Sequence, residues 1–274
     1  MHNLLVGYDG SRHSEVAVRQ AADLAGLLGA RLHLHRAIEP SGPENMADLG
    51  PASDPLAVID RVDALTNDEH FPTLQDDEFP PAVTRACEES GAVTTFNVAH
   101  GTPIRTLRER SVAMDMLVLG RHGRSGRVPI GATASNVVSR PIIPTLLCRD
   151  TLVPWGDVIV AYENTPTGGR ALKLAGELSN LLNVTLDVII AETERDKLRK
   201  SEAYVNTVLR AYHIEGSQMR HEGKMSDALT RAALEYQSSI VVVPDGRYCP
   251  WPWSRSETVR AALQFPAAMA LVVP

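Results

Sequence analysis

The feature that most constrains the fold is a repeat: the second half of the chain restates the first. Val6-Gly7-Tyr8-Asp9-Gly10-Ser11 matches Val160-Ala161-Tyr162-Glu163-Asn164-Thr165 at a shift of 154 positions, the distance from Asp9 to Glu163. The same shift carries a set of apolar positions onto one another without a gap: Ala17, Ala21, Leu24, Leu27, Leu28 and Leu32 fall on Ala171, Ala175, Leu178, Leu181, Leu182 and Leu186. A repeated core pattern predicts two copies of one fold. Because 274 residues suffice for two ordinary domains, we expect domains at 1–150 and 151–274.

Within the first copy, short apolar runs alternate with segments of helical periodicity. We expect strands near residues 3–8, 31–38, 92–99, 115–119 and 144–148, with helices after 11, at 82–90, from 103 to about 113 and at 131–140. Ser11 or Ser14 is a candidate N-cap for the helix that ends at Gly29. This alternation predicts an α/β fold with a parallel sheet, whose ligands bind at the carboxyl ends of the strands. Residues 40–81 read as an exposed excursion, part of it helical near 56–65.

A glycine-rich loop joins the predicted strand at 115–119 to the following helix. It contains Gly120, Arg121, His122, Gly123 and Arg124, then Arg127, and it closes with Gly131, Ala132 and Thr133. Glycines let a backbone approach a ligand closely, and the free N–H groups of a helix start attract anions. The loop therefore predicts a phosphate site. An ordinary strand-to-helix turn is the alternative, because a gapped glycine pattern is weak evidence by itself.

The loop Asp9-Gly10-Ser11 follows the first strand and is expected on the same rim of the sheet as Gly120. A carboxylate accepts hydrogen bonds from ribose or an amino group but repels phosphate, so Asp9 suits the nucleoside end of such a site. The alternative for Asp9 is a helix-capping or Asx-turn residue.

Composition and other motifs exclude several classes of function. The net charge of −6 argues against a nucleic-acid surface, and no apolar run reaches the length of a membrane span. The three cysteines show no C-x-x-C spacing, and neither G-x-S-x-G nor G-x-x-x-x-G-K-[ST] occurs. His33 and His35 share one face of a strand, yet no third metal ligand is evident. We expect a cytoplasmic protein.

These residues together resemble a tandem universal stress protein. The resemblance rests on Leu5-Val6-Gly7-Tyr8-Asp9-Gly10-Ser11, on Leu34-His35 leading to Ile38-Glu39-Pro40, on Val98-Ala99-His100-Gly101-Thr102-Pro103 and on the glycine loop. Members that bind ATP carry G-x-x-G, nine residues, then G followed by Ser or Thr. Gly120, Gly123 and Gly131 fit the glycines of this pattern. The loop here is two residues shorter, and Ala132 stands where the hydroxyl is expected, with Thr133 next.

The resemblance implies two Rossmann-like domains of the adenine nucleotide alpha hydrolase type, each an open sheet of five mostly parallel strands flanked by helices. It implies that the last strands of the two copies, around 145–148 and 271–273, pair within the chain. Its ligand would be ATP, with or without Mg²⁺, or AMP or ADP. Asp9, Gly10 and Ser11 with Ala37 and Ile38 would face adenine and ribose. The residues Gly120, Arg121, His122, Gly123, Arg124, Gly131, Ala132 and Thr133 would surround the phosphates.

The second copy differs at both loops of this candidate site. Glu163-Asn164 replaces Asp9-Gly10, and a segment rich in proline and tryptophan, which includes Trp251 and Trp253, replaces the glycine loop. We therefore expect a nucleotide only in the first half. A regulatory or stress-response protein is favoured over an enzyme, because no base or metal-binding carboxylate pair is evident near the phosphates. A slow ATP hydrolase and a scaffold that binds no nucleotide are the alternatives, and the chain is either a compact monomer or a homodimer.

Overall fold

The computed structural model describes residues 1–38, 79–122, 130–235, 240–245, 257–264 and 268–274. The first half contains β1 (Asn3–Gly7), α1 (Arg12–Leu28), β2 (Arg31–Ile38), α4 (Pro81–Glu89), β3 (Thr94–His100), α5 (Pro103–Ser111), β4 (Met116–Gly120), α6 (Ala132–Ser139) and β5 (Thr145–Cys148). The second half contains β6 (Val158–Tyr162), α7 (Pro166–Leu182), β7 (Leu186–Ala191), α8 (Arg195–Ala211), β8 (Gly216–His221), α9 (Met225–Glu235), β9 (Ile240–Pro244), α10 (Glu257–Leu263) and β10 (Met269–Val273). The described strands and helices alternate within each half, as expected, and β5 is followed directly by β6.

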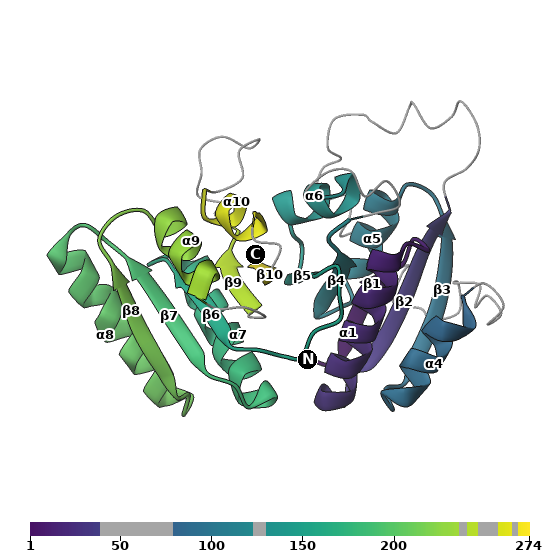
Figure 1. The fold of residues 1–274 in the computed structure, drawn as a ribbon, viewed down its shortest axis with the longest axis horizontal. Helices are drawn as coiled ribbons and strands as arrows, with labels where there is room; N and C mark the ends of the chain where they lie inside the picture. The colour runs from purple at the N-terminus through teal and green to yellow at the C-terminus, as the bar shows by residue number, and fades with distance from the viewer. Residues whose placement is uncertain (39–78, 123–129, 236–239, 246–256, 265–267) are drawn as a thin grey trace.

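The strands form one sheet in the order β3-β2-β1-β4-β5-β10-β9-β6-β7-β8 (Figure 1). Within each half every strand pair is parallel, and the two halves have mirror-related orders that meet in the middle. The expected α/β class with mostly parallel strands is confirmed.

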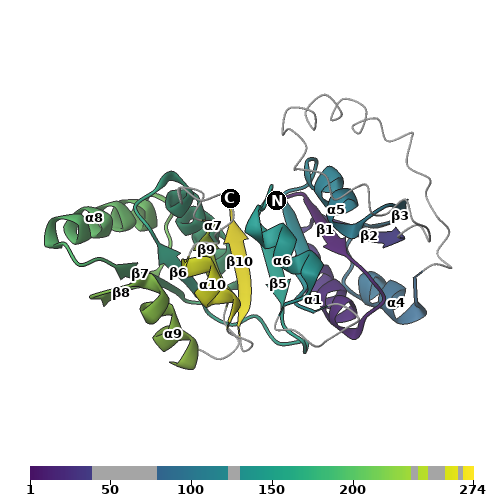
Figure 2. The same cartoon turned by 90° about the horizontal axis from the view of Figure 1, so that it is seen from above.

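The two halves meet where β5 and β10 pair antiparallel, the single reversal in this sheet of described strands. Leu271 lies opposite Leu146 and Ala270 opposite Leu147, so the strands expected to pair do so. Figure 2 shows these two strands side by side at the centre of the molecule. The junction is buried: Leu271 has no exposed surface, and Leu146 has almost none.

Helices cover both faces of the sheet and give a three-layer arrangement. Residues of α1, α4, α7 and α8 pack in one apolar cluster with one face of the strands. Residues of α5, α6, α9 and α10 pack in a second cluster on the other face. The central strands are apolar on both sides because both faces are covered; Leu4, Leu5 and Val6 of β1 have no exposed surface.

The ends of α1 follow the expected local chemistry. Ser11 is the N-cap, and its side-chain oxygen accepts a hydrogen bond from the backbone N–H of Ser14 at 3.1 Å. Gly29 ends the helix in the left-handed conformation with φ 60°. One of the repeated apolar positions does not face the core: Leu27 is half exposed, whereas Leu28 beside it packs against the apolar cluster.

Two expectations lie outside the described residues. These are the excursion up to residue 78 and the proline- and tryptophan-rich segment at 246–256. Among the described helices, none is long and apolar enough to cross a membrane.

Candidate functional site

The candidate site lies where the strand order of the first half reverses direction. The chain passes from β1 to β2 and β3 on one side, and β4 and β5 lie on the other side of β1. The loops that follow β1 and β4 therefore diverge at the carboxyl ends of adjacent strands. Open parallel sheets bind ligands at such a point.

The end of β4 contacts the first turn of α1 at Gly120. A Cβ on Gly120 would lie 2.8 Å from the carbonyl carbon and oxygen of His13, in the first turn of α1. A side chain at position 120 would thus force the end of β4 away from α1. The expectation that Asp9-Gly10-Ser11 and Gly120 share one rim is met.

Asp9 forms the turn that starts α1. Its Oδ1 accepts a hydrogen bond from the backbone N–H of Ser11 at 2.9 Å, and Gly10 between them has φ 78°. This is the Asx turn that the sequence left open as an alternative. Asp9 is half-buried and Gly10 is exposed, so the turn lies at the surface of the rim. A structural role for Asp9 is therefore present, and a ligand role remains a prediction.

The end of β2 forms the next part of the rim. Ala37 and Ile38 are half-buried at the last two positions of the strand. The carbonyl of Ile38 accepts a hydrogen bond from the N–H of Gly101 at 3.0 Å, which ties β2 to the turn after β3. One backbone acceptor that faces this rim is thus already used.

The far end of the glycine loop is the start of α6. Gly131 is the N-cap, and no side chain caps this helix. The N–H of Gly131 donates to the carbonyl of Arg121 at 2.9 Å, so the two ends of the loop are held together. Ala132 is exposed, and Thr133 is half-buried in the first turn. Gly123 and Arg124 lie outside the described residues.

Arg121 differs from its expected role as a positive charge around a phosphate. Its side chain is 2% exposed, and its Nη1 and Nη2 donate to the carbonyls of Leu263 and Ala268, each at 2.9 Å. Both acceptors belong to the second half. Burial lowers the pKa of Arg121, and the charge of Asp150 partly offsets this effect. The guanidinium lies at the contact between the halves because this contact offers it two backbone acceptors.

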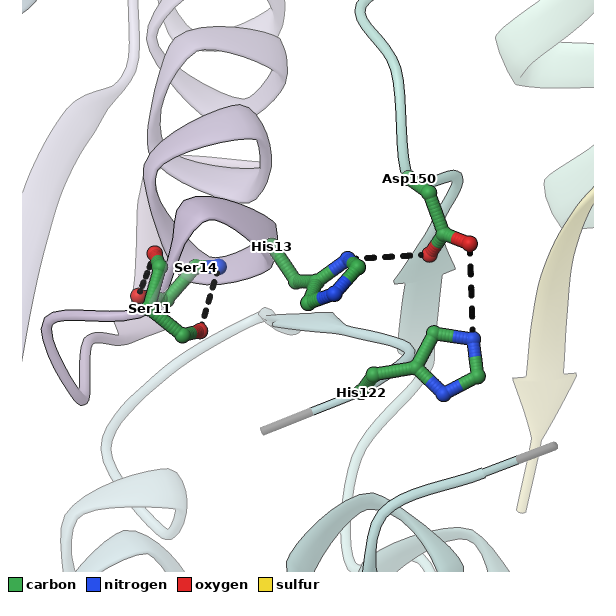
Figure 3. Close-up of polar contacts among 5 residues, drawn as sticks. All are labelled: Ser11, His13, Ser14, His122 and Asp150. Atoms are coloured by element: carbon green, nitrogen blue, oxygen red, sulfur yellow. Dashed lines mark hydrogen bonds and ion pairs between the residues drawn. The ribbon is translucent and has the colours of Figure 1, made fainter. Parts of the chain in front are cut away.

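His122 points to a carboxylate that the sequence analysis did not single out. Its Nε2 lies 3.4 Å from Oδ2 of Asp150, and Nδ1 of His13 lies 3.1 Å from Oδ1 of the same carboxylate. The two imidazole rings stand edge to face with their centroids 5.0 Å apart (Figure 3). Asp150 follows β5, next to β4, so the rule that placed the other loops on this rim could also have found it.

At the corresponding rim of the second half, a side-chain hydrogen bond joins two of the elements. Oε1 of Glu163 accepts a hydrogen bond from the hydroxyl of Thr258 at 2.7 Å, which links the loop after β6 to the first turn of α10. Burial raises the pKa of Glu163, and the Thr258 hydrogen bond opposes this shift. Thr258 and Thr133 each occupy the second position of their helix. In the second half, the carboxylate thus takes a partner from the protein.

Other polar sites in the described parts are unlike a ligand site. His35, which is buried, shares a hydrogen bond with Asn97 at 3.0 Å, and His33 contacts Thr95 at 2.7 Å. The described residues contain no group of three His, Cys, Asp or Glu arranged to hold a metal ion. A groove between α1 and α4 is lined by charged residues of both signs and by none of the predicted site residues: Arg19, Asp23, Arg85 and Glu89 among others.

The fold, with loops gathered at the carboxyl ends of its parallel strands, defines an α/β protein of the Rossmann-like type. A family model described as the universal stress protein family matches residues 1–149. The chain therefore belongs to the universal stress protein family. A search of curated proteins finds no match to this chain.

Solved structures of similar fold cover both halves. A universal stress protein from Archaeoglobus fulgidus is 17% identical, with a TM-score of 0.72 over 99% of this chain and 97% of its own. A functionally unknown protein from Pseudomonas aeruginosa is 15% identical, with a TM-score of 0.63 over 100% of this chain and 92% of its own. A shorter universal stress protein solved in complex with cAMP is 21% identical, with a TM-score of 0.36 over 55% of this chain and 98% of its own.

Proposed function

We propose that this chain is a regulatory stress-response protein that binds an adenine nucleotide at the rim of its first half. The observation that supports this most is the close approach of Gly120 to the first turn of α1, directly after the Asp9 loop, at the reversal of strand order. ATP is the favoured ligand, with ADP and AMP as relatives that lack one and two of its phosphates, and Mg²⁺ as a companion of the phosphates.

The proposed site has a nucleoside end and a phosphate end. The nucleoside end binds adenine and ribose and consists of Asp9, Gly10, Ser11, Ala37 and Ile38. The carboxylate of Asp9 accepts hydrogen bonds from the ribose hydroxyls or the adenine amino group. Gly120, Gly123 and the start of α6 serve the phosphates, since the first turn of α6 has no side-chain cap for its N–H groups. The hydroxyl of Thr133 takes the place of the one that Ala132 lacks. His122 and Arg124 complete this end, while Arg121 acts there through its backbone alone.

The proposal places the nucleotide in the first half only. In the second half the hydrogen bond between Thr258 and Glu163 joins the two elements between which a ligand would have to enter. The carboxylate that corresponds to Asp9 is thus occupied. The proposed domains are thus a nucleotide-binding domain at 1–150 and a second domain without a nucleotide at 151–274.

Slow ATP hydrolysis is the second candidate function, favoured by one observation. His122 lies in the glycine loop and contacts Asp150, which is the pairing that orients an imidazole to accept a proton from water. We favour binding without fast turnover, because no nucleophile or metal-binding carboxylate pair stands with it among the described residues. A cytoplasmic location, the absence of nucleic-acid and membrane partners, and pairing of two chains stay predictions.

Calorimetry on the full chain tests the site with ATP and AMP as probes. Asp9→Asn keeps an oxygen for the Asx turn but removes the charge, and charged hydrogen bonds contribute about 1.5–3 kcal/mol, so we expect roughly 10–100-fold weaker ATP binding. Glu163→Gln makes the same change of charge in the second half and should leave the affinity unchanged. Gly123→Val should abolish binding by filling the loop.

The outcomes separate the candidates. Absence of heat with both nucleotides would contradict the proposed site and favour the alternative, a scaffold that binds no nucleotide. Equal losses in Asp9→Asn and Glu163→Gln would contradict the restriction to the first half. Multiple-turnover phosphate release that disappears in His122→Asn would favour the hydrolase.

A further inference from the structure

Arg121 is a residue of the first half whose side chain is bound entirely within the second. It is the first residue after β4, and it lies 142 and 147 positions from its two acceptors, Leu263 and Ala268. Its third nitrogen, Nε, has no hydrogen-bond partner among the described residues. The guanidinium is almost fully removed from solvent. The two carbonyls therefore fix its position.

The two acceptors sit at structurally distinct ends. Leu263 is the last residue of α10, where carbonyls lack partners within the helix and carry the negative end of its dipole. Ala268 immediately precedes β10, the strand that forms the junction with β5. Arg121 thus holds the end of one element and the start of the next, on the second half's side of the junction.

The backbone of the same residue holds the glycine loop. The carbonyl of Arg121 accepts the N–H of Gly131, the N-cap of α6. One residue therefore joins the end of β4 to the start of α6 and to the α10–β10 segment, by which we mean Leu263 at the end of α10 and Ala268 before β10. Figure 2 shows α10 next to β10 and α6 next to β5. Both helices pack on the same face of the sheet, one in each half.

The corresponding residue of the second half is an acid, whose side chain cannot make the same contact. Asp245 follows β9 as Arg121 follows β4, and its backbone N–H donates to Val273 of its own half at 2.8 Å. A carboxylate cannot donate to carbonyls. The glycine loop of the first half is thus tied to the second half by a guanidinium, while the corresponding position of the second half carries an acid.

We propose that Arg121 couples the two halves: it is a positioning residue that fixes the glycine loop through the second half and transmits ligand occupancy from the loop to the α10–β10 segment. The ligand part of this proposal rests on the proposed nucleotide site. Coupling is reciprocal: if the contact of Arg121 with Leu263 and Ala268 strengthens nucleotide binding, then a bound nucleotide must strengthen this contact by the same factor. A second half without a nucleotide then has a role, as the receiver of the first half's state.

Amide hydrogen exchange on the full chain without ligand tests the contact itself. Arg121→Met keeps the length of the side chain but removes every donor. We expect roughly tenfold faster exchange at 130–133 and also at 263–264 and 268–269. Arg121→Lys retains one charged donor group and should give a smaller effect at the same places. It also provides a test if Arg121→Met fails to fold.

The control is another arginine bonded to a distant carbonyl. Nε of Arg170 donates to the carbonyl of Pro274 at 2.8 Å, within the second half and at the surface. Arg170→Met should leave exchange at 130–133 as in the wild type. A loss of protection at 130–133 in this variant equal to that in Arg121→Met would overturn the specific role of Arg121.

ATP as a probe tests the transmission. In the wild type, ATP should slow exchange at 263–264 and 268–269 as well as around the loop. In Arg121→Met the effect on the second half should vanish and ATP affinity should fall about tenfold. ATP binding without any change at 263–269 would overturn the coupling and leave the proposed function intact. Absence of ATP binding to the wild type would overturn both, while the ligand-free experiment would still decide whether Arg121 holds the loop.

Discussion

At the scale of single residues, His35 shows how burial sets a charge state. It is 3% exposed, and its Nδ1 shares a hydrogen bond with Asn97. Burial lowers the pKa of His35 from 6.5 to about 4, although the Asn97 contact opposes this shift. The native state therefore holds the imidazole neutral at pH values where the unfolded chain protonates it.

We expect this residue to make the protein less stable in mild acid. The unfolded chain binds the proton as the pH falls below 6.5, whereas the folded protein does so only near pH 4. Linkage gives a loss of about 2 kcal/mol of unfolding free energy between pH 7.5 and pH 5. Urea unfolding at the two pH values, in wild type and in His35→Gln, measures this term.

The variant should show a smaller decrease between the two pH values than the wild type. His100→Gln, which changes an exposed imidazole at the end of β3, is the control and should retain the wild-type pH dependence. An identical decrease in His35→Gln and wild type would show that His35 does not carry the effect.

The same scale shows what the sequence could and could not predict of the site. Asp9, Gly120 and Gly131 were correctly placed on one rim, because strand ends and glycine turns are local features. Arg121 was expected near a ligand, yet its acceptors lie more than 140 positions away in another half. Asp150, at the end of the first expected domain, is not among the residues that the sequence predicts for the site. Such contacts depend on how the halves pack, and no local pattern encodes that.

At the scale of elements, the first turn of α10 is held to the loop after β6 by one hydrogen bond. The hydroxyl of Thr258 donates to Glu163 at 2.7 Å, and Thr258 is nearly buried. The strands and helices themselves were predictable from periodicity, and β2 begins and ends where expected. This cross-element contact was not predicted, because it joins residues 95 positions apart.

Thr258→Val should destabilise the protein, and more at high pH than at low pH. The change leaves the carboxylate of Glu163 buried without this donor, which costs about 1–3 kcal/mol when it is ionised. Burial raises the pKa of Glu163 and the hydroxyl opposes it, so the variant raises this pKa further. Its folded state is then favoured below the unfolded pKa and weakened as the pH rises.

Thermal or urea unfolding at pH 4.5 and pH 8 measures this difference. Thr258→Ser keeps the hydroxyl and should retain most of the wild-type stability at both pH values. A loss in Thr258→Val that does not depend on pH would show that the ionised carboxylate of Glu163 does not depend on this hydrogen bond.

At the scale of the whole molecule, the pairing of β5 with β10 makes one sheet of two repeated halves. The alternation of strands and helices predicts parallel pairing within each half, and the strand order came from the structure. The pairing of the last strands was an implication of the family resemblance, and the register that places Leu271 opposite Leu146 required the structure. The junction pairs two strands that would otherwise be the exposed edges of two sheets, and it buries their apolar side chains.

We expect a cavity at this junction to weaken both halves. Leu271 is fully buried in β10, and truncation of a buried leucine to alanine costs about 2–5 kcal/mol. Because Leu271 packs across the pairing with β5, Leu271→Ala should reduce hydrogen-exchange protection in β4 and β5 of the first half as well as in β9 and β10. Leu209→Ala truncates another buried leucine, in α8, which packs next to β7 and is far from the junction. This variant should reduce protection in the second half alone. If both variants loosen only the second half, the junction does not join the halves into one cooperative unit, and the coupling through Arg121 would have to act across a boundary that unfolds independently.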